Sequence, residues 1–147
     1  MPKNQVNILV ESLSKRLCRT EGILLIIGRK ERDIDVIGEM VERMKTLLRI
    51  PVGVIFSTGI PNKDDSKYSE ILDSYDLSIG IGVREAELKA AVLLLDFRDA
   101  GAYTILIDRE KNELRSGVNM QIKAKFPGIF DFILRQAGGI KSGETFK

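Results

Sequence analysis

The sequence predicts one α/β domain with a Rossmann-like, mostly parallel sheet and helices on both faces. Short apolar segments alternate with amphipathic segments of roughly ten or more residues, as in strands joined by helical crossovers. Residues 22–28, GILLIIG, form an unbroken apolar run, which is typical of a strand buried on both faces of a parallel sheet. The length of 147 residues fits a single hydrophobic core.

The first half of the chain is predicted to contain two pairs of a helix and a strand. A helix should end before the 22–28 strand, because five apolar side chains recur there at helical spacing: Val6, Leu9, Val10, Leu13 and Leu17. A second apolar stripe runs from Ile37 to Leu48 and ends at Pro51, whose ring and missing N–H stop a helix. A second strand follows over 52–57.

The second half continues the alternation. A surface loop rich in Gly, Pro, Asn and Asp comes first. The further elements expected are a helix over 68–75, a strand over 76–83, a helix over 85–97 with Leu88, Ala91, Val92 and Leu95 inward, a strand over 102–108, a turn or short edge strand within 111–121, and a helix over 126–137 with Pro127 in its first turn. We divide the single domain into an N-terminal helix (1–21), a core (22–117) and a C-terminal helix and tail (118–147).

The composition excludes several kinds of chemistry. The chain has no histidine, which rules out imidazole as a base, an acid or a metal ligand. Its single cysteine, Cys18, excludes an internal disulfide and favours a reducing compartment. No apolar run is long enough to span a membrane, and no signal-peptide core is present, so we expect a soluble, cytoplasmic protein.

The net charge of +2 is unevenly distributed. Residues 1–32 and 111–147 each carry +4, whereas residues 33–110 carry −6. This balance is mild beside that of a committed nucleic-acid binder, so we expect at most weak contact with single-stranded DNA.

Four loops should carry any functional site, because parallel α/β sheets bind ligands at the carboxyl ends of their strands. These loops are residues 28–36, 58–66, 82–86 and 108–113. None contains a GxGxxG or GxxxxGK[ST] phosphate-binding motif in the required place. In the first loop, Asp33 and Asp35 either bind a cation or favour the start of a helix, and the neighbouring basic residues argue against a cation.

Three segments in order, GRKERDIDVIG, YDLSIGIGV and ILIDREKNE, resemble the DHH phosphoesterase superfamily, which includes the RecJ nucleases. The resemblance covers residues 22–117. It places Asp33, Asp35 and Asp108 on metal-binding aspartates of the family, but Arg29, Gly82, Arg109 and Glu110 on positions where the family has further histidine or aspartate ligands. Without those ligands the two-metal site of the family cannot assemble. The resemblance therefore implies a catalytically inactive relative that holds no metal or cofactor.

Inactive members of this family imply a specific role. The chain is similar to the archaeal RecJ-like and CDC-forty-five-like proteins, which suggests a non-catalytic scaffold in DNA replication. Its expected partners are the GINS complex and the MCM helicase, in association with the nucleoid. Three arginines of the former metal cleft, Arg29, Arg32 and Arg109, would either pair internally with Asp33, Asp35 and Glu110 or contact a phosphate or a partner carboxylate. Lys30 is a further candidate for contact with a phosphate or a partner.

Two alternatives come from other classes of protein. One is a phosphoesterase that uses a single metal ion held by Asp33, Asp35 and Asp108, since magnesium binds readily to carboxylates and water. The other is a Rossmann-like regulatory domain that binds a nucleotide, with loop glycines and arginines around the phosphate.

Overall fold

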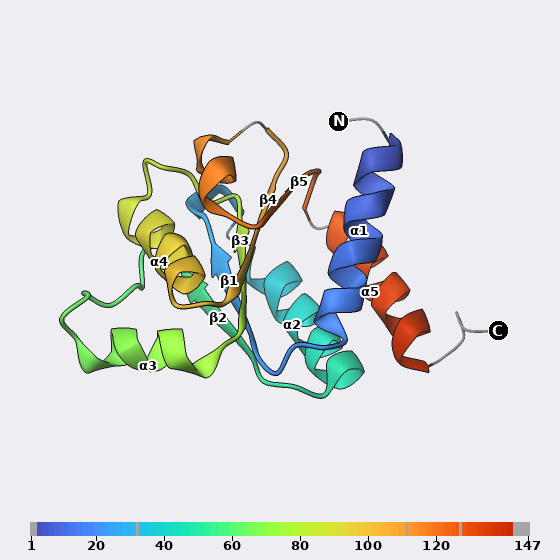
Figure 1. The fold of residues 1–147 in the computed structure, drawn as a ribbon, viewed down its shortest axis with the longest axis horizontal. Coiled ribbons are helices and arrows are strands. Elements are labelled where there is room, and N and C mark those ends of the chain that lie inside the picture. Colours follow the sequence, from blue (N-terminus) through green and yellow to red (C-terminus); the bar gives the residue numbers. More distant parts are fainter. Residues whose placement is uncertain (1–2, 32, 111, 127, 143–147) are drawn as a thin grey trace.

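The computed structural model describes residues 3–31, 33–110, 112–126 and 128–142, and it has the fold class that the sequence predicts (Figure 1). The helices are α1 (Lys3–Leu17), α2 (Ile34–Leu48), α3 (Ser66–Ser74), α4 (Leu88–Asp99) and α5 (Gly128–Ser142), with short 3-10 helices η1 (Arg29–Glu31) and η2 (Glu113–Gly117). The strands are β1 (Ile23–Ile27), β2 (Val52–Phe56), β3 (Leu77–Ile81), β4 (Tyr103–Asp108) and β5 (Met120–Lys123).

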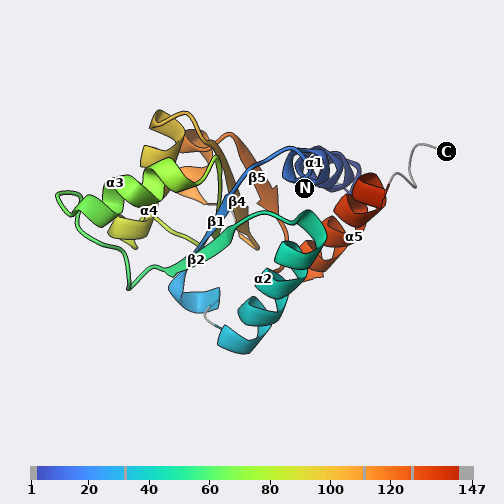
Figure 2. The same ribbon diagram turned by 90° about the horizontal axis from the view of Figure 1, so that it is seen from below.

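The five strands form one parallel sheet in the order β2-β1-β3-β4-β5. Helices α1, α2 and α5 cover one face, and α3 and α4 cover the other, as Figures 1 and 2 show from two directions. In the central strands, Ile23 of β1 pairs with Val52 on one side and with Leu77 on the other. Both strands that flank β1 therefore follow it in the sequence, and the connections after β1 and after β3 diverge.

Strand β1 is apolar throughout because both of its faces are buried. Alternate side chains point to opposite faces of a strand. Ile23, Leu25 and Ile27 belong to the core under α1, α2 and α5, whereas Leu24 and Ile26 belong to the core under α4. One segment of five residues therefore joins the two halves of the hydrophobic core, as the sequence predicts for 22–28.

The face that α4 buries differs from the predicted one. The structure exposes 68% of Leu88 and leaves Val92 and Leu95 half-buried, so of the four residues predicted to point inward only Ala91 is fully buried. The side chains in the core are Ala90, Ala91, Leu93, Leu94 and Phe97. Residues 90–95 are apolar all round the helix, so the spacing cannot show which face meets the sheet. The fully buried ring of Phe97, in the last turn of α4, lies on the face that packs against the sheet.

The segment 111–121 contains both of its predicted alternatives. Residues 113–117 form η2, and β5 then adds a short edge strand beside β4. The last helix begins at Gly128, close to the predicted start, while Pro127 lies outside the described residues.

Asp76, just before β3, has a structural role at the end of the sheet where the parallel strands begin. Its carboxylate accepts hydrogen bonds from the hydroxyl of Thr20 and from the backbone N–H groups of Glu21 and Gly22, at 3.1 and 3.0 Å. Partial burial would raise the pKa of Asp76, but these hydrogen bonds outweigh it and lower the pKa from its ordinary value of 3.8. The charged form therefore ties the chain entering β1 to the chain entering β3.

We expect Asp76→Asn to destabilise the domain by about 1 kcal/mol at pH 7, because the amide is a weaker acceptor than the carboxylate. A lowered native pKa gives stability that is present above the unfolded pKa and is lost as pH falls through the native one. The difference between the two proteins in urea unfolding should therefore shrink below pH 4. A difference that stays constant from pH 7 to pH 3 would contradict this role.

Candidate functional site

The candidate site lies between β1 and β3, where the connections that follow these two parallel strands diverge. These strands are neighbours, yet the chain leaves β1 for α2 on one face and leaves β3 for α4 on the other. In open α/β sheets, ligands bind in the crevice that such a divergence opens at the carboxyl ends of the strands. All four loops singled out in the sequence follow the carboxyl ends of strands, as expected.

The two diverging loops touch at their first residues. The backbone N–H of Gly28 donates to the carbonyl oxygen of Ile81 at 2.9 Å, and a Cβ at residue 28 would overlap the carbonyl oxygen of Gly82. Gly82 has a φ of +65°, in the left-handed region that favours glycine. This close contact fixes the floor of the crevice.

Glu31 of η1 lies over Gly82 and fills part of the crevice. A Cβ at residue 82 would come within 2.7 Å of the Cγ atom of Glu31, so only glycine leaves room for this side chain. The Oε1 atom of Glu31 is 3.0 Å from Nη2 of Arg109, and this hydrogen bond raises the pKa of Arg109. Only 13% of the Glu31 side chain is exposed, compared with 50% of Arg109. An internal carboxylate thus occupies part of the space where a ligand would enter.

Asp108, the last residue of β4, is the buried carboxylate of the site. Its side chain is 4% exposed and accepts hydrogen bonds from Nη2 of Arg84 at 3.2 Å and from Nδ2 of Asn112 at 2.9 Å. The backbone N–H of Glu110 donates to it at 3.2 Å. Asn112 also donates to the carbonyl oxygen of Val83 at 2.7 Å, which joins the loops after β3 and β4. With three donors around it, this carboxylate is fixed in place.

A hollow of about 140 Å³ remains among these side chains, and we call the residues that line it the carboxyl-edge site: Lys30, Glu31, Gly82, Arg84, Asp108, Arg109 and Glu110. Three cations and three carboxylates balance formally. Arg84 is shared between Asp108 and Glu110, its Nη2 atom lying 3.0 Å from Oε2 of Glu110. Arg84 and Arg109 are therefore positioned by internal pairing, and together with Lys30 they line one small space.

The predicted site residues separate into two groups. Gly82, Asp108, Arg109 and Glu110 line the carboxyl-edge site together, as does Lys30. Of the other described ones, Arg29, Asp33 and Asp35 do not line it. Arg29 is exposed in η1, with its backbone N–H donating to the Glu87 carboxylate at 3.2 Å.

The two aspartates of the first loop serve helix α2. Asp33 is its N-cap and accepts a hydrogen bond from the N–H of Val36 at 3.2 Å, while Asp35 is exposed in the first turn. Arg32 lies outside the described residues. Within the part of the chain that the structure describes, Asp33, Asp35 and Asp108 do not gather into a group able to hold a metal ion.

The ion pairs differ from the predicted internal network. Arg109 pairs with Glu31, and Glu110 pairs with Arg84, so neither described pair involves Asp33 or Asp35. Sequence reasoning missed Glu31, Arg84 and Asn112. Glu31 and Arg84 lie in loops marked for search, but nothing in the sequence shows which charges of different loops meet.

Comparisons with known proteins give a likeness of fold. No protein-family model matches the chain, and no curated protein matches it either. A structure from work on the mechanism and regulation of Sir2 enzymes has a TM-score of 0.71 and 10% identity, over 90% of this chain and 98% of that chain.

Two further solved structures have related architectures. The sugar isomerase domain of an RpiR transcription factor from Sphaerobacter thermophilus has a TM-score of 0.69 and 14% identity, over 96% of this chain and 85% of that chain. A variant Sir2 homologue in complex with ADP ribose has a TM-score of 0.65 and 11% identity, over 90% of this chain and 98% of that chain. At these identities the likeness establishes the fold and leaves the function open.

The predicted relationship to the DHH superfamily is wrong, and with it the role as a replication factor, because the structural neighbours are Sir2 and sugar isomerase domains. The matching motifs have local explanations instead. Asp33 caps a helix, and Asp76 of the YDL segment anchors the entry to β3. Such aspartates suit many parallel α/β sheets, so three of them in order do not identify a family.

The GINS and MCM partners and the weak DNA contact were expected from that resemblance and from the charge distribution. Neither the structure nor the comparisons test them, and their main motivation is gone. Among the described residues, no helix is long and apolar enough to cross a membrane.

Arg84→Ala should destabilise the domain by about 2 kcal/mol, because it removes the cationic partner of the buried Asp108 carboxylate. Arg98→Ala is the matched control, since Arg98 is exposed and its side chain donates to the carbonyl oxygen of Ser116. Urea unfolding at pH 7 measures both losses. Equal losses for the two variants would show that Arg84 does not hold Asp108 in place.

Proposed function

We propose that the carboxyl-edge site binds the phosphate group of a phosphorylated sugar or of a nucleotide containing one, as a binding domain without catalytic turnover. The observation that carries the proposal is that Lys30, Arg84 and Arg109 line one hollow, at the topological switch point between β1 and β3. Lysine and arginine are the side chains that bind phosphate best, and sheets of this class bind ligands at the switch point.

The size of the hollow limits what enters it. About 140 Å³ accommodates a phosphate group, but ligand pockets that enclose a whole drug-sized molecule hold roughly 300 Å³ or more. The sugar would therefore extend from the hollow toward solvent. Glu31 indicates how the phosphate binds, because its carboxylate already accepts a hydrogen bond from Arg109 as an anionic oxygen of the ligand would.

The named ligands of the structural neighbours support the same class. One Sir2 homologue was solved with ADP ribose, and the RpiR domain is described as a sugar isomerase domain. Their common feature is a sugar, which ADP ribose presents together with phosphate. The absence of histidine and the three donors that hold Asp108 favour binding over acid–base catalysis.

Isothermal titration with fructose 6-phosphate, ADP ribose and inorganic phosphate should give saturable binding for at least one of them, and fructose without phosphate should give none. The double variant Lys30→Ala/Arg109→Ala should weaken binding about tenfold or more, because it removes two cationic contacts to the phosphate. Lys67→Ala/Arg98→Ala, which removes two exposed cations elsewhere, is the control. Unchanged affinity in the site variant would overturn the proposal.

A second titration tests the role of Glu31. Glu31→Ala should bind the same phosphorylated ligand about three- to tenfold more tightly, because Arg109 loses its internal partner and a like charge leaves the hollow. Glu31→Gln should fall between the two proteins, and Glu70→Ala on exposed α3 should match the unsubstituted one. Weaker binding in Glu31→Ala would mean that Glu31 supports the ligand rather than competing with it.

A further inference from the structure

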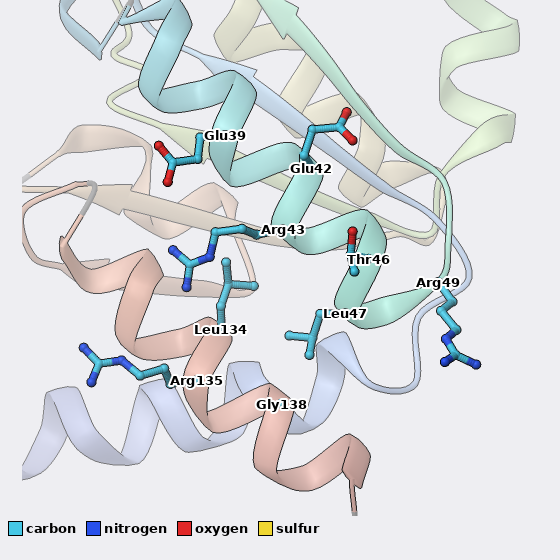
Figure 3. Close-up of a pocket in the computed structure, with 9 residues that line it drawn as sticks. All are labelled: Glu39, Glu42, Arg43, Thr46, Leu47, Arg49, Leu134, Arg135 and Gly138. Atoms are coloured by element: carbon cyan, nitrogen blue, oxygen red, sulfur yellow. The ribbon is translucent and has the colours of Figure 1, made fainter.

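A wide hollow lies between α2 and α5 and does not include the carboxyl-edge site. It has a volume of about 960 Å³. We call it the α2–α5 groove, and Figure 3 shows its lining: Glu39, Glu42, Arg43, Thr46, Leu47, Arg49, Leu134, Arg135 and Gly138. Its floor is apolar, with Leu134 buried and Leu47 half-buried, while charged side chains form its rim.

Internal contacts fix the shape of the groove. Asp131 of α5 binds Arg43 of α2 at 2.8 Å and Arg135 at 2.7 Å, and the hydrogen bonds from these arginines lower the pKa of Asp131. Further along, a Cβ at Gly138 would lie 3.3 Å from the Cδ1 atom of Leu47, so glycine lets the two helices approach closely. The groove is a formed feature of the folded chain.

The charges along the rim are separated by sign. Glu39 and Glu42 lie in the middle of α2, and Arg49 lies at its C-cap, about 10 Å further along the axis from Glu42. Neither Glu39 nor Arg49 forms an ion pair with any described residue, and Glu42 has only Lys45 at 3.8 Å. The acidic and basic ends of this edge are thus available to an outside partner.

A second copy of the chain fits this arrangement of charges. In a two-fold interface, if residue i of one copy contacts residue j of the other, then j also contacts i. An antiparallel α2 pair centred near residue 45 places Glu39 and Glu42 of each copy opposite Arg49 of the other. The same surface then supplies both members of each ion pair, and Leu47 becomes covered in both copies.

We propose that the α2–α5 groove is the contact surface of a symmetric homodimer, in which α2 of each copy packs into the groove of the other. The proposal is independent of the phosphate site, whose residues do not line the groove.

Light scattering coupled to size-exclusion chromatography tests the dimer on the full chain, at tens of micromolar protein and low salt. The unsubstituted protein should have twice the chain mass of 16.5 kDa. Glu39→Arg/Glu42→Arg should raise the dimer dissociation constant at least tenfold, because it sets like charges against Arg49. Arg49→Glu should do the same by facing the two glutamates.

Mixing the two variants distinguishes lost contacts from lost folding. In the mixed pair both contacts again join opposite charges, so a heterodimer of twice the chain mass should form although each variant alone is monomeric. Glu70→Arg/Asp73→Arg makes the same charge change on α3, on the opposite face of the sheet, and should remain dimeric. A monomeric unsubstituted protein, or charge-reversal variants that dimerise as well as it does, would overturn the proposal, as would a mixture that stays monomeric.

Discussion

The contact between the loops that follow β1 and β3 fixes the geometry of the carboxyl-edge site. Strand β1 is buried on both faces and has β2 and β3 as its neighbours, so the chain must leave β1 and β3 in opposite directions. At the point of divergence a Cβ at Gly28 would overlap the backbone of Gly82, and a Cβ at Gly82 would meet the side chain of Glu31. The crevice and the place of Glu31 are set there.

Electrostatic compensation then determines what the crevice contains. Arg84 holds the buried Asp108, and Arg109 is held by Glu31, so each of these two guanidinium groups has an internal carboxylate. Such pairing positions guanidinium groups without leaving a buried charge alone. In the function that we propose, an anionic ligand would enter by exchange and take the hydrogen bond that Arg109 now donates to Glu31.

The misleading motifs show how local structure can imitate a family signature. An aspartate that begins a helix after a strand is a common N-cap, as Asp33 is, and an aspartate before a strand can accept backbone hydrogen bonds, as Asp76 does. Both roles recur wherever strands and helices alternate. Positions that match metal ligands in a family therefore carry weight only when the folded chain brings them together, and here Asp33 and Asp35 remain with α2.

The fold class and the order of the elements follow from the sequence alone. Apolar runs such as 22–28 predict strands buried on both faces, and stripes such as that from Ile37 to Leu48 predict helices with one buried face. It also determined which loops to search, because the carboxyl ends of parallel strands meet at one edge. These properties follow from side-chain periodicity, which is local.

The buried face of α4 and the pairing of charges between loops depend on how the folded chain packs. Residues 90–95 are apolar all round, so contact with the sheet and with Phe97 selects among faces that the sequence leaves equivalent. Glu31 and Arg109 are far apart in the chain and become partners because the β2-β1-β3-β4-β5 order brings their loops to one crevice. Strand order is a property of the whole chain, and no spacing within one segment records it.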